Sequence, residues 1–152
     1  MNLKLIVLTV VVITLFSCGG STPTEEKTTE VKVEENAAPA DPMSDKGIGP
    51  IKSIDITADV NTAMATEGEA IFTAKCTACH KIGKRYIGPD LAGVTTRRTP
   101  EWIMNMILNP VEMVEKNEIA KKLLAEYNAP MANQNLTEEE ARKVLEFFRT
   151  KN

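Results

Sequence analysis

The sequence predicts a small all-α domain in the C-terminal part of the chain. Two observations lead to this class: helix-start signals precede two apolar segments within residues 51–152, and the flanks of residues 76–80 contain no good strand run. About one hundred residues are enough for one small domain. This region carries equal numbers of acidic and basic side chains, so a basic excess that would favour nucleic-acid binding is absent.

Two helices are expected from their start signals. In TPEWIMNMIL, Thr99 is in the N-cap position and Pro100 in the first helical position. The last helix begins at the capping box formed by Thr137 and Glu140. Its predicted apolar face consists of Ala141, Val144, Leu145 and Phe148, and its predicted i,i+4 ion pairs are Glu138–Arg142 and Glu139–Lys143.

Two further helices are expected from apolar spacing, one at about 62–75 and one at 118–127. Gly68 interrupts the first, at a cost of about 1 kcal/mol relative to alanine. A close approach of the last helix near Phe147 or Phe148 would explain this glycine.

The first 17 residues are typical of a signal peptide. The apolar run from Leu5 to Phe16 is shorter than the roughly 20 residues that a membrane-spanning helix needs. Leu15, Ser17 and Cys18 resemble the lipobox of bacterial lipoproteins, which implies cleavage before Cys18 and lipidation of that cysteine. The alternatives are an uncleaved N-terminal anchor or an ordinary signal followed by a spare cysteine. In every case the rest of the chain is exported, and the resemblance implies a lipid-anchored protein on the periplasmic side of a bacterial membrane.

Residues 18–50 are predicted to be the lipidated cysteine followed by a flexible acidic tether. The segment is rich in Thr, Glu, Pro and Ala and contains no aromatic residue, so it cannot bury enough apolar surface to fold. As a random coil it would reach about 30 Å. The domain would then occupy residues 51–152. Residues 47–57 are more apolar than the tether, and whether they pack on the domain as an arm is left open.

The stretch CTACH, residues 76–80, carries the chemistry. Cys76, Cys79 and His80 offer three ligands within five residues, whereas a structural zinc site usually needs four. A thioredoxin-like dithiol needs a βαβ setting, which the flanks lack. Cys-x-x-Cys-His is also the attachment signature of c-type haem. Cysteines at i and i+3 lie on one face of a helical turn, so both sulfurs can reach one edge of the porphyrin while the histidine turns toward the iron.

Beyond this motif, the chain resembles the class I cytochrome c family over roughly residues 60–150. The resemblance rests on Gly68 and Phe72, CTACH, the run Gly88-Pro89-Asp90-Leu91, Met131 and the amphipathic last helix. It implies a cytochrome c-like helical domain wrapped around one covalently bound haem c. It also implies that His80 is the proximal ligand and that the carbonyl of Pro89 accepts a hydrogen bond from its ring.

The distal ligand cannot be a second histidine from this chain, because His80 is the only one. Met, Lys, Asn, Tyr, water or no ligand remain open by this count. The family resemblance favours Met131, in the loop before the last helix, with Met113 as the second candidate. A Met/His pair raises the reduction potential.

Side chains beyond the iron ligands are also expected to contribute. Arg97 and Trp102, together with Tyr86 and Arg98, are candidates to contact the haem propionates. Six basic residues surround the motif in sequence and are candidates to steer an acidic redox partner: Lys75, Lys81, Lys84, Arg85, Arg97 and Arg98.

The predicted function is that of a membrane-tethered one-electron carrier that cycles Fe(II)/Fe(III) haem c between respiratory partners, as a monomer. The alternative is a peroxidase-like haem enzyme or ligand sensor with an open distal site. GPDLAGV and PMANQNLTEEEARKVLEFF resemble small lipoprotein cytochromes associated with nitrous oxide reductase. The resemblance implies a membrane quinol-oxidising complex as donor and a terminal oxidase or reductase, such as nitrous oxide reductase, as acceptor.

Overall fold

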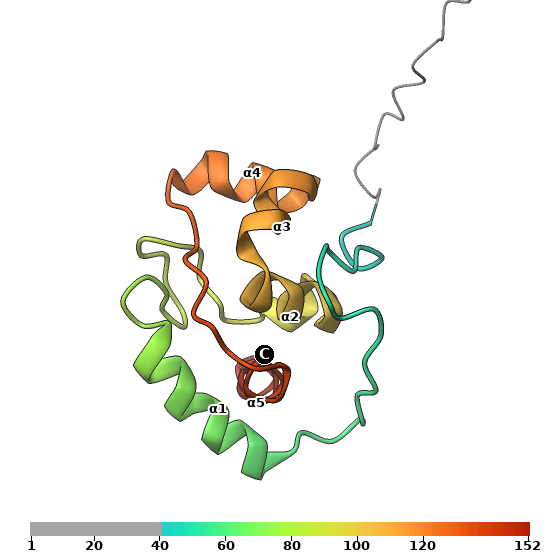
Figure 1. Ribbon diagram of the computed structural model, residues 1–152. Helices are drawn as coiled ribbons and strands as arrows, with labels where there is room; N and C mark the ends of the chain where they lie inside the picture. The colour runs from blue at the N-terminus through green and yellow to red at the C-terminus, as the bar shows by residue number, and fades with distance from the viewer. Residues whose placement is uncertain (1–40) are drawn as a thin grey trace, which may run out of the picture. The chain divides into compact units, whose positions relative to one another are not determined.

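The computed structural model describes residues 41–152, which form a helical domain with no strand in this range (Figure 1). The predicted signal peptide, Cys18 and most of the tether lie outside the described residues. Five α-helices follow one another along the chain, with one short 3₁₀ turn: α1 (Thr62–Lys75), η1 (Val94–Thr96), α2 (Pro100–Leu108), α3 (Pro110–Lys116), α4 (Glu118–Tyr127) and α5 (Glu138–Arg149). The predicted all-α class is therefore confirmed. None of the described helices has the length and apolar character that crossing a membrane requires.

Helices α1 and α5 cross each other, and Gly68 lies at the crossing; Figure 1 views α5 end-on beside α1. A Cβ atom added to Gly68 would collide with the backbone carbonyl of Lys143 and would lie 2.9 Å from the backbone nitrogen of Val144. The predicted close approach is confirmed, although the contact lies at these two residues and not near Phe147 or Phe148.

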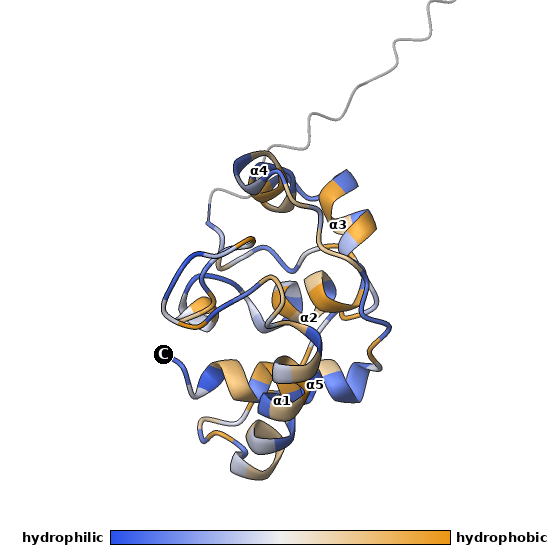
Figure 2. Cartoon of the chain, turned by 90° about the vertical axis from the view of Figure 1, so that its left-hand side faces the viewer, coloured by the Kyte–Doolittle hydropathy of each residue, from blue (hydrophilic) through white to orange (hydrophobic). Residues whose placement is uncertain are grey.

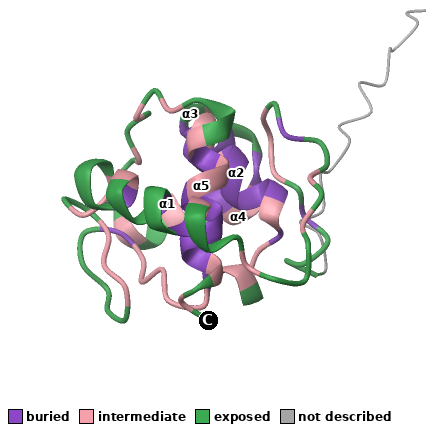
Figure 3. Cartoon of the chain, turned by 90° about the horizontal axis from the view of Figure 1, so that it is seen from below, coloured by how far each residue is buried: buried purple, intermediate pink, exposed green. Residues whose placement is uncertain are grey.

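Three phenylalanines pack together where these helices meet. The ring of Phe72 lies 5.2 Å from that of Phe147 and 5.7 Å from that of Phe148, between ring centroids. All three are buried. Figure 3 shows that the buried residues gather around α2 and α5, in the middle of the described domain. Helix α5 contains both hydrophobic and hydrophilic residues (Figure 2). Ala141, Val144, Leu145 and Phe148, its predicted apolar face, are all buried.

The helix starts follow the local sequence. The Thr99 hydroxyl accepts from the backbone N–H of Trp102, and Thr137 and Glu140 form the predicted capping box. Helix α3 was not expected, because the stretch after Pro110 was interpreted as irregular. A proline at the first helical position is compatible with a helix, since the N–H that it lacks has no partner within the helix there.

An N-terminal arm, defined here as residues 45–51, packs on the domain. The Asn105 side chain, which is 1% exposed, joins it in three places. Its amide oxygen accepts from the N–H of Ile51 at 2.9 Å, and its amide nitrogen donates to the carbonyls of Lys46 and Ile51 at 2.9 Å each. These bonds satisfy backbone groups that would otherwise be buried without partners.

Asp45 fixes the start of this arm. Its carboxylate accepts from the amide of Asn117 at 2.7 Å, and its backbone carbonyl accepts from the Thr99 hydroxyl at 2.6 Å. Both partners cap helices, since Thr99 begins α2 and Asn117 begins α4. The folded part therefore includes residues 45–50, which the composition had placed in the tether.

A buried carboxylate in α5 fixes the chain just before α1. Glu146 has no exposed surface, and it bonds Arg142, Arg149 and the backbone N–H of Asn61. Arg142 therefore pairs within α5 with Glu146, so the predicted pair with Glu138 is wrong. The predicted pair of Glu139 and Lys143 is present, at 2.8 Å.

Candidate functional site

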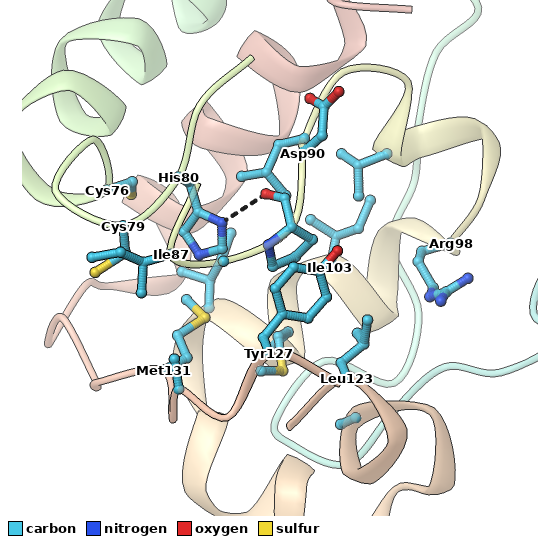
Figure 4. A pocket seen from close by; sticks show the side chains of 18 of the residues that line it. Cys76, Cys79, His80, Ile87, Asp90, Arg98, Ile103, Leu123, Tyr127 and Met131 are labelled. Atoms are coloured by element: carbon cyan, nitrogen blue, oxygen red, sulfur yellow. Dashed lines mark hydrogen bonds between the residues drawn. The ribbon is translucent and has the colours of Figure 1, made fainter. Parts of the chain in front are cut away.

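A largely apolar pocket lies between the loop that follows α1 and the loop that precedes α5 (Figure 4). Helices α2, α4 and α5 also supply part of its wall. Three chemically distinctive groups line it: the two thiols of CTACH, the imidazole of His80 and the thioether of Met131. Most of the remaining wall is apolar and includes Ile87, Leu91, Val94, Ile103, Met106, Ile107, Leu123, Leu124 and Phe148.

The end of α1 presents the cysteines and the histidine together. Cys76 caps α1, and the backbone N–H groups of Cys79 and His80 both donate to its carbonyl, at 3.1 and 2.9 Å. This tight turn places all three side chains along one wall of the pocket. Burial, with a smaller effect of Cys79, raises the pKa of Cys76 to about 11. The free Cys76 side chain is therefore a neutral thiol at neutral pH, and Cys79 is exposed beside it.

The imidazole of His80 is oriented by the loop that follows it. Its Nδ1 lies 3.2 Å from the carbonyl of Pro89, and because a carbonyl only accepts, Nδ1–H is the donor. Burial lowers the pKa of His80 more than this hydrogen bond raises it, so the ring is neutral at pH 7. Its Nε2 lone pair is then free to bind a metal, as the predicted proximal role requires.

Gly88 leaves room for this ring. A Cβ atom at Gly88 would lie 2.5 Å from Cε1 and 2.8 Å from Nδ1 of His80. Asp90 holds the same loop in shape, because its Oδ1 accepts from the backbone N–H groups of Gly83 and Ala92, at 2.7 and 2.8 Å. The bond from Ala92 contributes most to lowering the pKa of Asp90. In the sequence, Gly88 and Asp90 are recognisable only as part of the family resemblance, and no local signal indicates these roles.

Met131 lies on the opposite wall of the pocket. Its loop begins where Asn128, with a φ of 49°, ends α4, a backbone conformation that asparagine tolerates better than most residues. Downstream, the amide of Asn133 donates to the carbonyl of Leu108 at 3.2 Å. Figure 4 shows the sulfur of Met131 on the side that faces His80. The structure thus brings the two predicted iron ligands to one cavity from opposite sides.

The second candidate ligand, Met113, is elsewhere. It is fully buried in α3 and does not line the pocket. Its sulfur accepts from the backbone N–H of Ile48 at 3.0 Å and so contacts the N-terminal arm. In this arrangement Met113 packs the core and cannot serve as the distal ligand.

Three of the residues predicted to contact the haem propionates have hydrogen-bond partners within the protein. Trp102 lines the pocket, but its indole N–H donates to Asn117 at 3.2 Å, so this donor is directed away from a propionate. Arg97 also lines the pocket, and its guanidinium donates to the carbonyls of Ala92 and Asp90. Arg98 lies over the Trp102 ring, 5.3 Å from its centroid. In Figure 4 Arg98 lies at the end of the pocket away from the cysteines, and its guanidinium donates to the carbonyl of Arg97 at 2.6 Å.

The six basic residues named from the sequence have different surroundings. Lys75, Arg97 and Arg98 line the pocket. Arg85 pairs with Glu126, and Lys81 donates to the carbonyl of Thr77 at 2.7 Å. Lys84 is exposed and forms no ion pair with the described residues. These six residues therefore do not form one uniform basic patch.

The residues of this pocket fit a covalently attached haem. Two thiols on one turn can take the two attachment points at one porphyrin edge, and the neutral imidazole beside them can bind the iron. The apolar walls suit the flat macrocycle, and a thioether faces the imidazole. Fold and pocket together define a small helical protein that carries a single haem c.

Comparison with known proteins agrees with this class. The family model for cytochrome c matches residues 65–151, and the chain belongs to the cytochrome c family. Its cofactor is one covalently bound haem c. The solved structure of cytochrome c from Rhodothermus marinus is 42% identical, with a TM-score of 0.66. The match covers 67% of this chain and 88% of the Rhodothermus marinus chain.

More distant matches point the same way. A cytochrome c domain from Pseudomonas putida is 33% identical and covers 55% of this chain and 85% of that chain, with a TM-score of 0.51. A cytochrome c-553-like protein of Synechocystis sp. is 40% identical over an alignment of 58 residues, and the alignment covers 35% of this chain. The matched part spans 55% of the length of that curated relative.

Proposed function

We propose that this protein is a one-electron carrier in which His80 and Met131 would be the two protein ligands of the haem iron. The observation that carries this proposal is the approach of both side chains to one pocket from opposite walls. When bound, the haem supplies a reversible Fe(II)/Fe(III) couple, and a Met/His pair raises its reduction potential. With His80 and Met131 both bound, the iron would have no free site for a substrate. This arrangement would favour electron transfer over catalysis.

The other residues of the pocket support this role. Cys76 and Cys79 would hold the haem through thioether bonds, and the Pro89 carbonyl fixes the plane of the proximal ring. Apolar side chains exclude water from the haem faces, which helps to set the potential. Arg98, at the end away from the cysteines, would balance a propionate charge.

The location and the partners are also part of the proposal. The lipobox resemblance at Leu15, Ser17 and Cys18 supports a lipid anchor on the periplasmic side of a bacterial membrane. The acidic stretch before the arm would act as the tether. The proposed donor is a membrane quinol-oxidising complex, and the proposed acceptor is a terminal oxidase or reductase, with nitrous oxide reductase as the first to test. Exposed basic residues such as Lys84 would favour acidic partners.

The electron-carrier proposal is tested by optical spectroscopy on the purified holoprotein. We expect a reversible one-electron redox titration, a far-red band of the oxidised form that marks a sulfur–iron bond, and no rapid binding of carbon monoxide to the reduced form. Rapid binding of carbon monoxide, together with absence of that band, would instead support a haem enzyme or ligand sensor with an open distal site.

A further inference from the structure

Two loops flank the pocket, and the side chain of Arg85 joins the first loop to the end of the helix from which the second loop continues. The first, residues 81–91, follows His80; the second, residues 128–137, carries Met131. Arg85, on the first loop, reaches the end of α4, where the second loop begins. Its Nη1 donates to the carboxylate of Glu126 at 3.1 Å, and its Nη2 donates to the backbone carbonyl of the same residue at 3.3 Å.

Arg85 also covers the last residue of α4. Its guanidinium carbon lies 4.0 Å from the centroid of the Tyr127 ring, which is within the range of a cation–π contact. Tyr127 itself lines the pocket. One side chain therefore makes two hydrogen bonds and one ring contact at the point where the chain leaves α4 for Met131.

Because these contacts lie directly before the loop that carries Met131, they affect the position of Met131. The loop is attached at both ends: Asn133 bonds the Leu108 carbonyl downstream of Met131, and the Arg85 contacts hold the chain upstream of it. Asn128 turns the chain directly after Tyr127, so movement of the end of α4 would move Met131 with it. Arg85 thereby joins the loop that orients the His80 ring to the end of α4, directly before the loop that carries Met131.

We infer that Arg85 is a positioning residue that keeps Met131 bound to the iron and disfavours its replacement by other ligands. The inference rests on the proposed ligation by Met131. The contacts are exposed, so each is of modest strength, and together they predict about a five- to tenfold change in the apparent affinity for a competing ligand.

The test compares Arg85→Gln with Lys84→Gln in the oxidised holoprotein. The two substitutions each remove one positive charge from neighbouring positions, but Lys84 forms no ion pair with the described residues. Imidazole is titrated into each protein while the sulfur–iron band is followed. We expect the apparent imidazole affinity to rise about five- to tenfold in Arg85→Gln, to stay at the wild-type value in Lys84→Gln, and to be intermediate in Arg85→Lys.

A second measurement guards against a general loss of structure. Amide hydrogen exchange is expected to rise in residues 128–134 of Arg85→Gln and to be unchanged in α1 and α5. Equal imidazole affinities in Arg85→Gln and Lys84→Gln would overturn the inference. If both affinities were raised equally, the change would reflect the loss of positive charge alone. If the wild-type protein lacks the sulfur–iron band, ligation by Met131 fails first, and the role of Arg85 fails with it.

Discussion

The imidazole of His80 is held by contacts on two of its edges. Pro89 accepts from Nδ1–H, and Gly88 passes so close to the ring that any side chain there would displace it. Burial keeps the ring neutral at pH 7. Nε2 is therefore presented to the pocket in one orientation and one protonation state, as binding of a metal by this atom requires.

The two methionines that the sequence offered as distal ligands have different environments, which makes them a matched pair for experiment. We predict that Met131→Leu removes the sulfur–iron band, lowers the reduction potential and lets carbon monoxide bind the reduced form, because the iron loses its proposed thioether ligand. Met113→Leu keeps the spectrum, because Met113 does not line the pocket; it preserves volume in the core but removes the sulfur that accepts from the Ile48 N–H, so we expect it to cost about 1–3 kcal/mol of stability. Loss of the band in Met113→Leu, with the band retained in Met131→Leu, would contradict this assignment.

At the scale of elements, the N-terminal arm depends on one side chain of α2. We predict that Asn105→Ala lowers the free energy of unfolding by about 2–3 kcal/mol, because it leaves the buried N–H and carbonyl of Ile51 without partners and removes the bond to the part-buried carbonyl of Lys46. The arm should then become sensitive to protease. Denaturant unfolding and limited proteolysis measure both effects. Lys52→Ala, with its exposed side chain next to the arm, is the control, and an equal loss in both variants would count against this role of Asn105.

Helix α5 and the segment before α1 are joined by an ionised carboxylate. Burial alone would raise the pKa of Glu146, but the hydrogen bonds from Arg142, Arg149 and the Asn61 N–H outweigh burial, so the pKa lies below its ordinary value of 4.5. A carboxyl whose pKa is lower in the folded state stabilises the fold fully above the unfolded value. This contribution is lost as the pH falls below about 4.5 through the folded value.

We therefore predict that Glu146→Gln is less stable than the wild type at pH 7 and that the difference narrows as the pH is lowered below about 4.5. Thermal unfolding measured across pH 3 to 7, a range set by the ordinary carboxyl pKa values, provides the comparison. Glu69→Gln, on the exposed side of α1, should follow the wild type. A constant difference between Glu146→Gln and the wild type over this range would show that the carboxylate charge does not contribute.

At the scale of the whole molecule, the features that depend on neighbouring residues could be predicted from the sequence, whereas the long-range contacts could not. The bounds of α1, α2, α4 and α5 agree with the expected helices because their caps and apolar spacing are written in adjacent residues. Helix α3 was missed because the stretch after Pro110 was interpreted as irregular. The bonds of the arm join residues 54 and 72 positions apart, such as Ile51 to Asn105 and Asp45 to Asn117, and no local pattern indicates them.

The site divides in the same way. Cys76, Cys79 and His80 are recognisable because the chemistry needs them next to each other, and the Pro89 contact was predicted through the family resemblance. The Asn117 partner of Trp102 and the bridge from Arg85 to the end of α4 depend on how distant segments meet. Polar side chains of this kind gain their role only in the folded chain.

The haem itself is expected to be part of the core, because the pocket draws its walls from α2, α4, α5 and both flanking loops. A domain of this size buries little apolar surface of its own, and the pocket-lining side chains would lose their shared packing partner without the haem. We predict that the double variant Cys76→Ala, Cys79→Ala is haem-free and largely unfolded, as judged by circular dichroism. Cys79→Ala alone keeps one thiol, Cys76, for attachment and should melt between this variant and the wild type. A cooperative, native-like melt of the double variant would show instead that the five helices fold without the haem.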